Sequence, residues 1–431
     1  MDKNLELYIH IPFCVRKCNY CDFLSFSADE STQLEYAKAL IREIDYYGAL
    51  MGERQVSAIY IGGGTPTWLD HRLMLEIMEH IFAQFWVLPD AEISMECNPG
   101  TVTKDAMEHY RKAGINRLSI GLQSADNEEL KLLGRIHTYE QFLKTYELAR
   151  NAGFSNINVD LISGLPYQKA ERFANTLQEV IRLKPEHISA YTLIVEKGTP
   201  FYDQFKFDAV RQEAGLSTEV LPSEDEAYQI YKMTQRMLTE AGFKQYEVSN
   251  YARRGYACKH NVGYWTRKNY LGMGLGAASL MDNVRYSNTR DLYTYIEESK
   301  HITVKELEYE EEEFVGYGDK KETELPPNTA FWELERKMVT KRVLGVSLHE
   351  SGQLLNRKAQ MEEFMFLGLR MTDGVSRTDF EEAFGTPIEA VYRDVMIELK
   401  NEELLEVHAG QIRLTEKGMD LSNYAMAKFL L

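Results

Sequence analysis

Three of the five cysteines in this 431-residue chain stand close together near its N-terminus. They are Cys14, Cys18 and Cys21, in the stretch "YIHIPFCVRKCNYCDF". Three thiols cannot all pair as disulfides, and a chain without a secretory leader is expected to keep its thiols reduced. The spacing C-x3-C-x2-C therefore predicts metal binding, and thiolates are the ligands that iron-sulfur clusters need.

The fourth ligand decides what kind of centre these thiols would form. Three thiolates satisfy three irons of a four-iron cluster and leave the fourth iron open, as a catalytic metal keeps an open position. Other interpretations stay open at this point. They are a structural zinc completed by a histidine such as His10, a closed cluster completed by Cys97 or Cys258, and three unrelated core thiols.

Strands and helices alternate along the first half of the chain. Short apolar runs rich in β-branched residues predict strands at residues 7–11, 57–61, 92–96, 117–122, 157–162 and 187–194. Helical patterns lie between them, and Ser31 is the candidate cap of the first helix. This order predicts a parallel sheet with right-handed crossovers. Polar residues at the strand ends favour a complete or partial (β/α) barrel over an open sheet.

Four segments are expected from the change of pattern along the chain. Residues 1–205 predict the barrel core, and residues 206–300 predict an extension of it that contains "HNVGYW". The acidic run "ELEYEEEE" predicts a solvated insertion or linker over residues 301–330, in the form of an exposed loop. Residues 331–431, with a hairpin in "EVHAGQIRLTEKG", predict a mainly helical C-terminal domain of winged-helix type.

Composition excludes several classes of protein. Hydrophobic residues make up 44% and charged residues 27%, the balance of a globular protein. The formal net charge of -17 argues against bulk nucleic-acid binding, which needs a basic surface. No run of residues approaches the length of a membrane span, so a cytoplasmic location is expected, with peripheral membrane contact left open.

Several motifs occur in order along the chain and share one resemblance. They are "HIPFCVRKCNYCDF", "GGGTPTWL", "ECNPGTV", "RLSIGLQS", "GRIHTYEQ", "NVDLISGLPYQ", "HISAYTLIVEKGTPFY" and "EEFMFLGLRMTDGVS". The first resembles the cluster loop of radical S-adenosylmethionine (SAM) enzymes. Together they resemble the oxygen-independent coproporphyrinogen III oxidases and their relatives, the HemW-type radical SAM heme chaperones. The resemblance implies an α/β fold, a partial (β/α)6 radical SAM barrel with a C-terminal, mainly helical, winged-helix-like domain.

The resemblance also assigns site residues. It implies that Cys14, Cys18 and Cys21 ligate a 4Fe-4S cluster whose open iron chelates the amino and carboxylate groups of SAM. The positions that match SAM contacts are Tyr8, Gly63 and Glu96, and those that match a second SAM or substrate site in the oxidases are Tyr20, Gly64, Thr65, Gln123, Arg135 and Asp160. The residue types agree, because carboxylates accept hydrogen bonds from ribose hydroxyls and arginine pairs with carboxylate.

Two features separate the chaperones from the oxidases. The oxidases carry a further cysteine two residues after the third ligand, where this chain has Phe23. The segment "HNVGYW" matches an HNxxYW signature associated with the chaperones. In it His260 offers an imidazole to heme iron, while Tyr264 and Trp265 offer flat apolar faces. The alternatives are that His260 only packs and hydrogen-bonds, and that Cys258 contacts heme.

The resemblance therefore implies a protein that binds a 4Fe-4S cluster, SAM and heme, and delivers heme to acceptor proteins such as respiratory hemoproteins. An alternative is a true oxidase that decarboxylates the propionates of coproporphyrinogen III to vinyl groups. A further alternative is a binding protein with a cluster that never cleaves SAM. Phe23 and the HNxxYW segment favour the chaperone over the oxidase.

Overall fold

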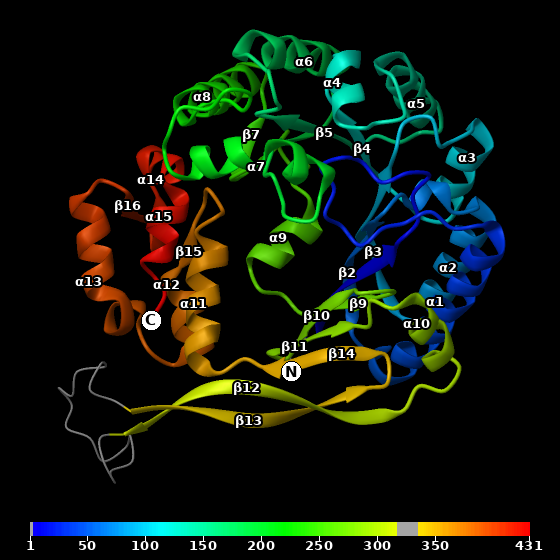
Figure 1. Ribbon diagram of the computed structural model, residues 1–431. Helices are drawn as coiled ribbons and strands as arrows, with labels where there is room; N and C mark the ends of the chain where they lie inside the picture. Colours follow the sequence, from blue (N-terminus) through cyan, green and yellow to red (C-terminus); the bar gives the residue numbers. More distant parts are fainter. Residues whose placement is uncertain (1–2, 317–334) are drawn as a thin grey trace.

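The structure is a computed structural model that describes residues 3–316 and 335–431 (Figure 1). Its two main hydrophobic cores are separate. The larger lies between a curved sheet and the helices outside it, and the smaller lies among the C-terminal helices, around Phe380 and Tyr392. The chain therefore folds as a barrel domain followed by a smaller domain.

All six predicted strands are present and pair in sequence order. They are β1 (Asn4–Ile11), β2 (Gln55–Gly63), β3 (Trp86–Cys97), β4 (Arg117–Gln123), β5 (Ile157–Ser163) and β6 (His187–Thr192). Each neighbouring pair in this series is parallel. The prediction of a partial (β/α)6 barrel is confirmed.

Helices cover the outer face of this curved sheet (Figure 1). They are α1 (Glu30–Met51), α2 (His71–Gln84), α3 (Lys104–Lys112), α4 (Asn127–Leu132), α5 (Tyr139–Asn151) and α6 (Ala170–Leu183). Alternate strand residues such as Leu5, Leu7 and Ile9 are fully buried beneath them. The cap of α1 is Asp29 and not Ser31, since the Asp29 carboxylate accepts the Thr32 backbone N–H at 2.8 Å.

The sheet continues on both sides of the six strands. Beside β1 come β9 (Tyr270–Met273), β10 (Ala278–Met281), β11 (Val284–Asn288) and β14 (His349–Leu354), and beside β6 come β8 (Asn250–Ala252) and β7 (Lys244–Glu247). Three further helices are α7 (Pro200–Glu213), α8 (Glu224–Glu240) and α10 (Leu292–Glu298). The short helix α9 (Lys259–Trp265) lies inside the curve of strands (Figure 1).

The acidic run is a strand, so the prediction of an exposed loop is wrong for its described part. β12 (Val304–Gly316) pairs with β13 (Glu335–Val346) in an antiparallel ribbon. Glutamates of the run pair across the ribbon with basic residues of β13: Lys341 lies 2.6 Å from Glu311, and Arg342 lies 2.8 Å from Glu308. These partners stand far along the sequence, so the acidic run by itself looks like a solvated loop. The rest of the predicted insertion, residues 317–330, lies outside the described residues.

The C-terminal domain contains α11 (Arg357–Gly368), β15 (Val375–Ser376), α12 (Arg377–Phe384), α13 (Ile388–Asn401), β16 (Leu405–His408), β17 (Gln411–Leu414), α14 (Glu416–Asp420) and α15 (Ser422–Ala427). The predicted hairpin is β16 and β17, in a three-stranded sheet with β15. The helical part begins at α11 rather than at residue 331, because β13 pairs with β12 and β14 pairs with β11 of the barrel sheet. Within the described ranges, no helix has the length and apolar character to cross a membrane.

Candidate functional site

The inner faces of the barrel strands are polar. Parallel register brings Glu96 opposite Ser119, and Gly121 opposite Asp160. The Ser119 hydroxyl donates to the Asp160 carboxylate at 2.8 Å, and the Tyr60 hydroxyl donates to Glu96 at 3.0 Å. Because side chains alternate along a strand, the same pattern that buries apolar residues under the helices turns these polar groups inward.

The cysteine loop follows β1 at the carboxyl end of the barrel. Its two sides are tied together where the Cys14 backbone N–H donates to the Phe26 carbonyl at 2.9 Å, and its middle is tied to the segment after α4 where the Asn19 N–H donates to the Leu133 carbonyl at 3.0 Å. The Cys14 sulfur lies 3.4 Å from the Thr65 hydroxyl. Burial raises the pKa of the Cys14 and Cys21 thiols, so a bound cation would be needed to hold both as thiolates.

A cavity of about 530 Å³ opens where this loop meets the strand ends. The predicted site residues that line it are Cys14, Cys18, Cys21, Tyr20, Gly63, Gly64, Thr65, Glu96, Gln123, Arg135 and Asp160. Its volume lies within the range of about 300 to 1,000 Å³ that is typical of small-molecule sites. Residues spread from position 14 to position 160 of the sequence therefore meet in one ligand-sized space.

Gly63 occupies a position that no other residue would fill without strain. Its φ is +110°, and a Cβ atom there would lie 2.4 Å from the His10 ring. Its backbone N–H donates to the Glu96 carboxylate at 3.1 Å. The glycine at the end of β2 therefore lets the backbone lie close to His10 of β1 and Glu96 of β3, in the wall of the cavity.

Two carboxylates give the cavity its electrostatic character. Burial, and then the nearby charge of Asp160, raises the pKa of Glu96 to about 7. Burial also raises the pKa of Asp160, although hydrogen bonds from Ser119 and Asn158 oppose the rise. Both carboxylates would be stabilised by a ligand that brings a positive charge or hydroxyl donors into the cavity.

The guanidinium of Arg135 is a buried positive charge in the wall of the cavity, next to the cysteine loop. Its guanidinium donates to the Asn98 side chain at 2.6 Å and to the Gly121 carbonyl at 2.7 Å, and it lies 3.7 Å from the Cys18 sulfur. Among the described residues its Nε has no hydrogen-bond partner. A buried guanidinium with an unused donor suits an anionic group next to the thiols. Gln123, close by, has a φ of +72°, a strained conformation of the kind that clusters at ligand sites.

The donor set fits a cluster with three protein ligands better than a single zinc ion. His10 already interacts with the Leu24 carbonyl at 2.9 Å and the Tyr8 hydroxyl at 3.0 Å. In the described residues 3–316 and 335–431, the sulfurs of Cys14, Cys18 and Cys21 do not all lie within 4.8 Å of one another, as the ligands of a single zinc ion would. Burial raises the pKa of Cys97 and of Cys258 to about 12, which disfavours either as a fourth thiolate.

Two predicted site residues are not in the lining of the cavity. Tyr8 lies one layer deeper on the inner face, with its ring 6.4 Å from that of Tyr60. His260 lies on α9, where its Nδ1 is 3.1 Å from the buried carboxylate of Glu6 and its ring stacks on Tyr60 at 5.1 Å. The structure therefore does not bring the HNxxYW histidine to the cysteines.

Several residues of the cavity are absent from the sequence-based prediction. They include Tyr60, Asn98, Ser119 and Tyr191. Tyr60 has the parity of Gly64 and Ser119 has that of Gln123, so the two-residue period of β2 and β4 was the available signal for them. Tyr191 lies on β6, where the sequence singled out no site residue. Asn98 stands inside the motif "ECNPGTV" and bridges Thr65 to Arg135.

Family models match both domains of the chain. A radical SAM superfamily model matches residues 8–180, and a HemN C-terminal domain model matches residues 355–421. The solved structure of the coproporphyrinogen III oxidase HemN of Escherichia coli, a radical SAM enzyme, is similar, with a TM-score of 0.76 at 25% identity over 99% of this chain and 90% of that one. The fold, the cysteine loop and these matches define a radical SAM protein.

Two similar proteins show which branch of the radical SAM superfamily this chain belongs to. The heme chaperone HemW of Lactococcus lactis is 31% identical over 431 residues, which cover 100% of this chain and 98% of that protein. The heme chaperone HemW of Escherichia coli is 41% identical over 274 residues, 63% of this chain and 69% of that protein. This chain belongs to the HemW family.

Proposed function

We propose that this chain holds a 4Fe-4S cluster on Cys14, Cys18 and Cys21, binds SAM beside it, and binds heme for delivery to acceptor proteins such as respiratory hemoproteins. The observation that carries the proposal is the convergence of three thiols, two carboxylates and a buried guanidinium on one cavity, in a chain of the HemW family. The oxidase HemN is also similar, but over the full length at lower identity than the HemW proteins.

The residues of the cavity suit the parts of SAM. A bound cluster of this type would supply the electron for reductive cleavage of SAM. Glu96 and Asp160 would accept hydrogen bonds from the ribose hydroxyls and the ammonium, and binding would offset the cost of their buried charge. Arg135 would hold the negative charge of the thiolate-bound cluster or of a carboxylate.

The mouth of the same cavity suits an amphipathic dianion. Phe23 and Ile194 line it with side chains that are 70% and 69% exposed, so two large apolar surfaces are available to a ligand at the mouth. Arg16 and Lys17 line it as well. Heme has flat apolar faces and two carboxylates, so we place the heme contact here. In the described chain no histidine lines this cavity.

The test is a heme titration of the anaerobically reconstituted protein, followed by optical spectroscopy and run beside an assay for conversion of coproporphyrinogen III. Stoichiometric heme binding without conversion is expected. Formation of protoporphyrinogen without retained heme would overturn the proposal and make the chain an oxidase. Detection of 5'-deoxyadenosine from the reduced protein would separate a protein that cleaves SAM from one that only binds it.

A matched pair of variants tests the position of the heme contact. Phe23→Ser is expected to weaken heme binding about tenfold, because it removes an aromatic contact worth about 1.5 kcal/mol or more. The control is Leu50→Ser, since Leu50 is 63% exposed and does not line the cavity. Equal heme affinities in the two variants would move the heme contact away from the mouth.

A further inference from the structure

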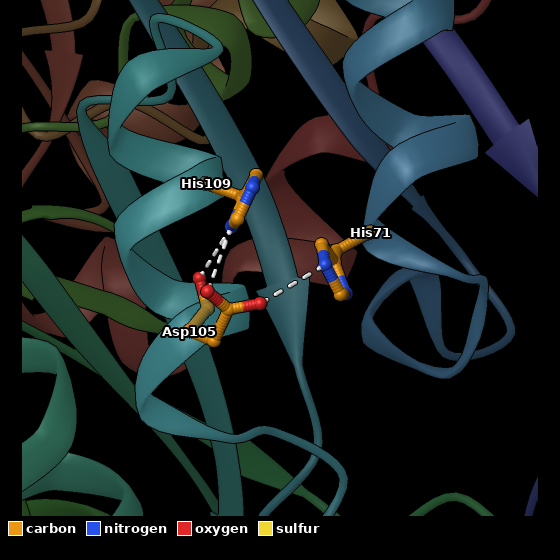
Figure 2. A group of neighbouring side chains, drawn as sticks. All are labelled: His71, Asp105 and His109. Atoms are coloured by element: carbon orange, nitrogen blue, oxygen red, sulfur yellow. Dashed lines mark hydrogen bonds and ion pairs between the residues drawn. The ribbon is translucent and has the colours of Figure 1, made fainter.

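A second group of metal-binding side chains lies on the outside of the barrel, between α2 and α3. His71 is the first residue of α2, and Asp105 and His109 stand one turn apart on α3. Figure 2 shows the three side chains pointing toward one another from the two helices. None of them lines the cavity with the cysteines.

Their spacing matches that of ligands around one small cation. Nε2 of His71 lies 3.3 Å from one carboxylate oxygen of Asp105, and Nδ1 of His109 lies 3.5 Å from the other. Bonds of about 2.0 to 2.1 Å in a tetrahedral arrangement place ligand atoms roughly 3.3 to 3.5 Å apart. These two distances end on different Asp105 oxygens, but with one ligand atom taken from each residue all three lie within 4.8 Å of one another. Rotation of the side chains would bring them to the ligand spacing.

Neighbouring groups orient His71 for metal binding, whereas His109 would have to exchange a hydrogen bond for the metal. Nδ1 of His71 faces the Asp70 carboxylate at 3.9 Å, which leaves Nε2 directed toward Asp105. Nδ1 of His109 donates to the Asp105 backbone carbonyl at 2.8 Å, so its imidazole would have to turn to face a cation. Metal binding at Nδ1 would move this proton to Nε2, a change of tautomer that leaves the imidazole neutral.

The group is also distinct and accessible. In the described ranges it is the only set of three His, Cys, Asp or Glu residues with ligand atoms this close. The side chains of His71, His109 and Asp105 are 26%, 28% and 69% exposed, so an ion can enter from solvent and water can complete the coordination. The two imidazole rings lie 4.6 Å apart, an arrangement that a shared cation would stabilise.

We propose that His71, Asp105 and His109 form a zinc site that clamps α2 to α3. Two imidazoles and one carboxylate are ligands that suit Zn²⁺, and a set of three leaves the fourth position for water. The site is independent of the cluster and of the heme proposal, because it shares no residue with the cavity.

The experiment is a zinc titration of the full chain carrying its cluster, after removal of adventitious metal with a chelator. Free Zn²⁺ is set with a metal buffer, and zinc and iron per chain are measured by mass spectrometry. One zinc per chain with a dissociation constant of about 1 µM or tighter is expected, with iron unchanged. His71→Ala and His109→Ala are each expected to weaken zinc binding at least tenfold, since second-sphere changes alone weaken metal sites tenfold or more.

The control is His80→Ala. His80 also lies on α2 and pairs with an aspartate, Asp45, at 2.8 Å, but it belongs to no group of three ligands. This variant should bind zinc like the wild type. Zinc should raise the thermal unfolding temperature of the wild type and of His80→Ala but not that of His71→Ala. Unchanged zinc content in His71→Ala and His109→Ala, or binding weaker than about 100 µM in the wild type, would overturn the proposal.

Discussion

The two ends of the barrel are built from the same strands and behave differently. At the open end, which is the carboxyl end of β1 to β6, Glu96 and Asp160 face a cavity beside the cysteines. At the closed end, which is the amino end, Glu6, Glu92 and Arg117 are almost completely buried. Polar side chains point inward at both ends, so inward polarity by itself does not mark a ligand site.

Helix α9 is what closes the second end. Its Lys259 backbone N–H donates to Glu92 at 2.9 Å, and its His260 lies 3.1 Å from Glu6. At Gly263 a Cβ atom would lie 1.9 Å from a Glu6 carboxylate oxygen, so a larger residue there would have to displace the buried Glu6 side chain. The C-terminal domain packs behind it, with Arg370 stacked over the Trp265 ring at 4.3 Å.

Ligand chemistry in this barrel is confined to the end where polar groups face open space. Buried charges at the closed end interact with α9 and with one another, although Oε1 of Glu6 and Nε of Arg117 have no hydrogen-bond partner among the described residues. Because α9 covers these charges, we infer that they serve the fold. Carboxylates at the open end are hydrogen-bonded but still face a space that a ligand can fill. Substitutions at one end of the barrel at a time should therefore affect either ligand binding or stability.

The largest effect is expected from the cysteine loop. Replacing Cys14, Cys18 or Cys21 with Ala should abolish the cluster, because each supplies one of the three proposed thiolate ligands. Iron and sulfide content after anaerobic reconstitution measure this. Cys97→Ala, which changes a buried thiol outside the loop, should retain full iron. Full iron in any of the three loop variants would remove that cysteine from the ligand set.

At the closed end, Arg117→Met should destabilise the fold by about 3 to 5 kcal/mol, because it leaves buried carboxylate without its cation. Arg117 is 1% exposed and interacts electrostatically with Glu92. Urea unfolding followed by circular dichroism measures the loss. Arg72→Met, at a side chain that is 77% exposed, should change stability by less than about 0.5 kcal/mol. Equal effects of the two changes would contradict a structural role for the closed end.

The open end should show a pH signature. The pKa of Glu96 rises from 4.5 in the unfolded chain to about 7 in the fold, so the folded state binds the extra proton. The contribution of Glu96 to the free energy of unfolding is therefore full below pH 4.5 and is lost as the pH rises through 7. Each pKa unit is worth about 1.4 kcal/mol, so the loss reaches up to about 3 kcal/mol.

Glu96→Gln should remove this pH dependence, because glutamine does not ionise. Urea unfolding of the cluster-free wild type and variant at pH 5 and pH 8 measures it. The wild type should lose stability relative to the variant between the two pH values. A constant difference between them would mean that the open end does not disfavour the charged carboxylate.

Asp160→Asn should weaken SAM binding about tenfold or more, since a hydrogen bond to a charged group contributes about 1.5 to 3 kcal/mol. Equilibrium dialysis of the reconstituted protein measures the affinity, and the cluster absorbance should not change. Asp45→Asn, outside the cavity, is the control. Unchanged affinity would remove Asp160 from the SAM site.

Among these substitutions, His260→Ala is expected to change the spectrum of the heme-loaded protein least. Since His260 is bonded to Glu6 at the closed end, His260→Ala should leave the Soret band of the heme-loaded protein unchanged and lower stability by about 1 to 3 kcal/mol. Absorption spectroscopy and urea unfolding measure the two quantities. An altered Soret band would instead support His260 as a heme ligand.

Local sequence determined much of this molecule. Strand and helix periodicity predicts the six barrel strands, because burial under helices selects one apolar face on each strand. The resemblance of its motifs to a known family implied eleven of the 27 residues that line the cavity. They meet there because the carboxyl ends of parallel strands lie at one edge of a sheet. Reasoning from local sequence failed for the acidic run, whose partners stand about 30 residues later in β13.

Only the tertiary structure decided what each polar residue does. The segment "HNVGYW" carries the residue types of a heme site, yet Gly263 lets its helix fill the closed end and Glu6 takes up the imidazole. The meeting of His71 with His109 likewise depends on how α2 and α3 pack, which no local pattern encodes. Side-chain chemistry is local, but burial and partners come from contacts between segments far apart in the sequence, and these determine whether a polar group binds a ligand or supports the fold.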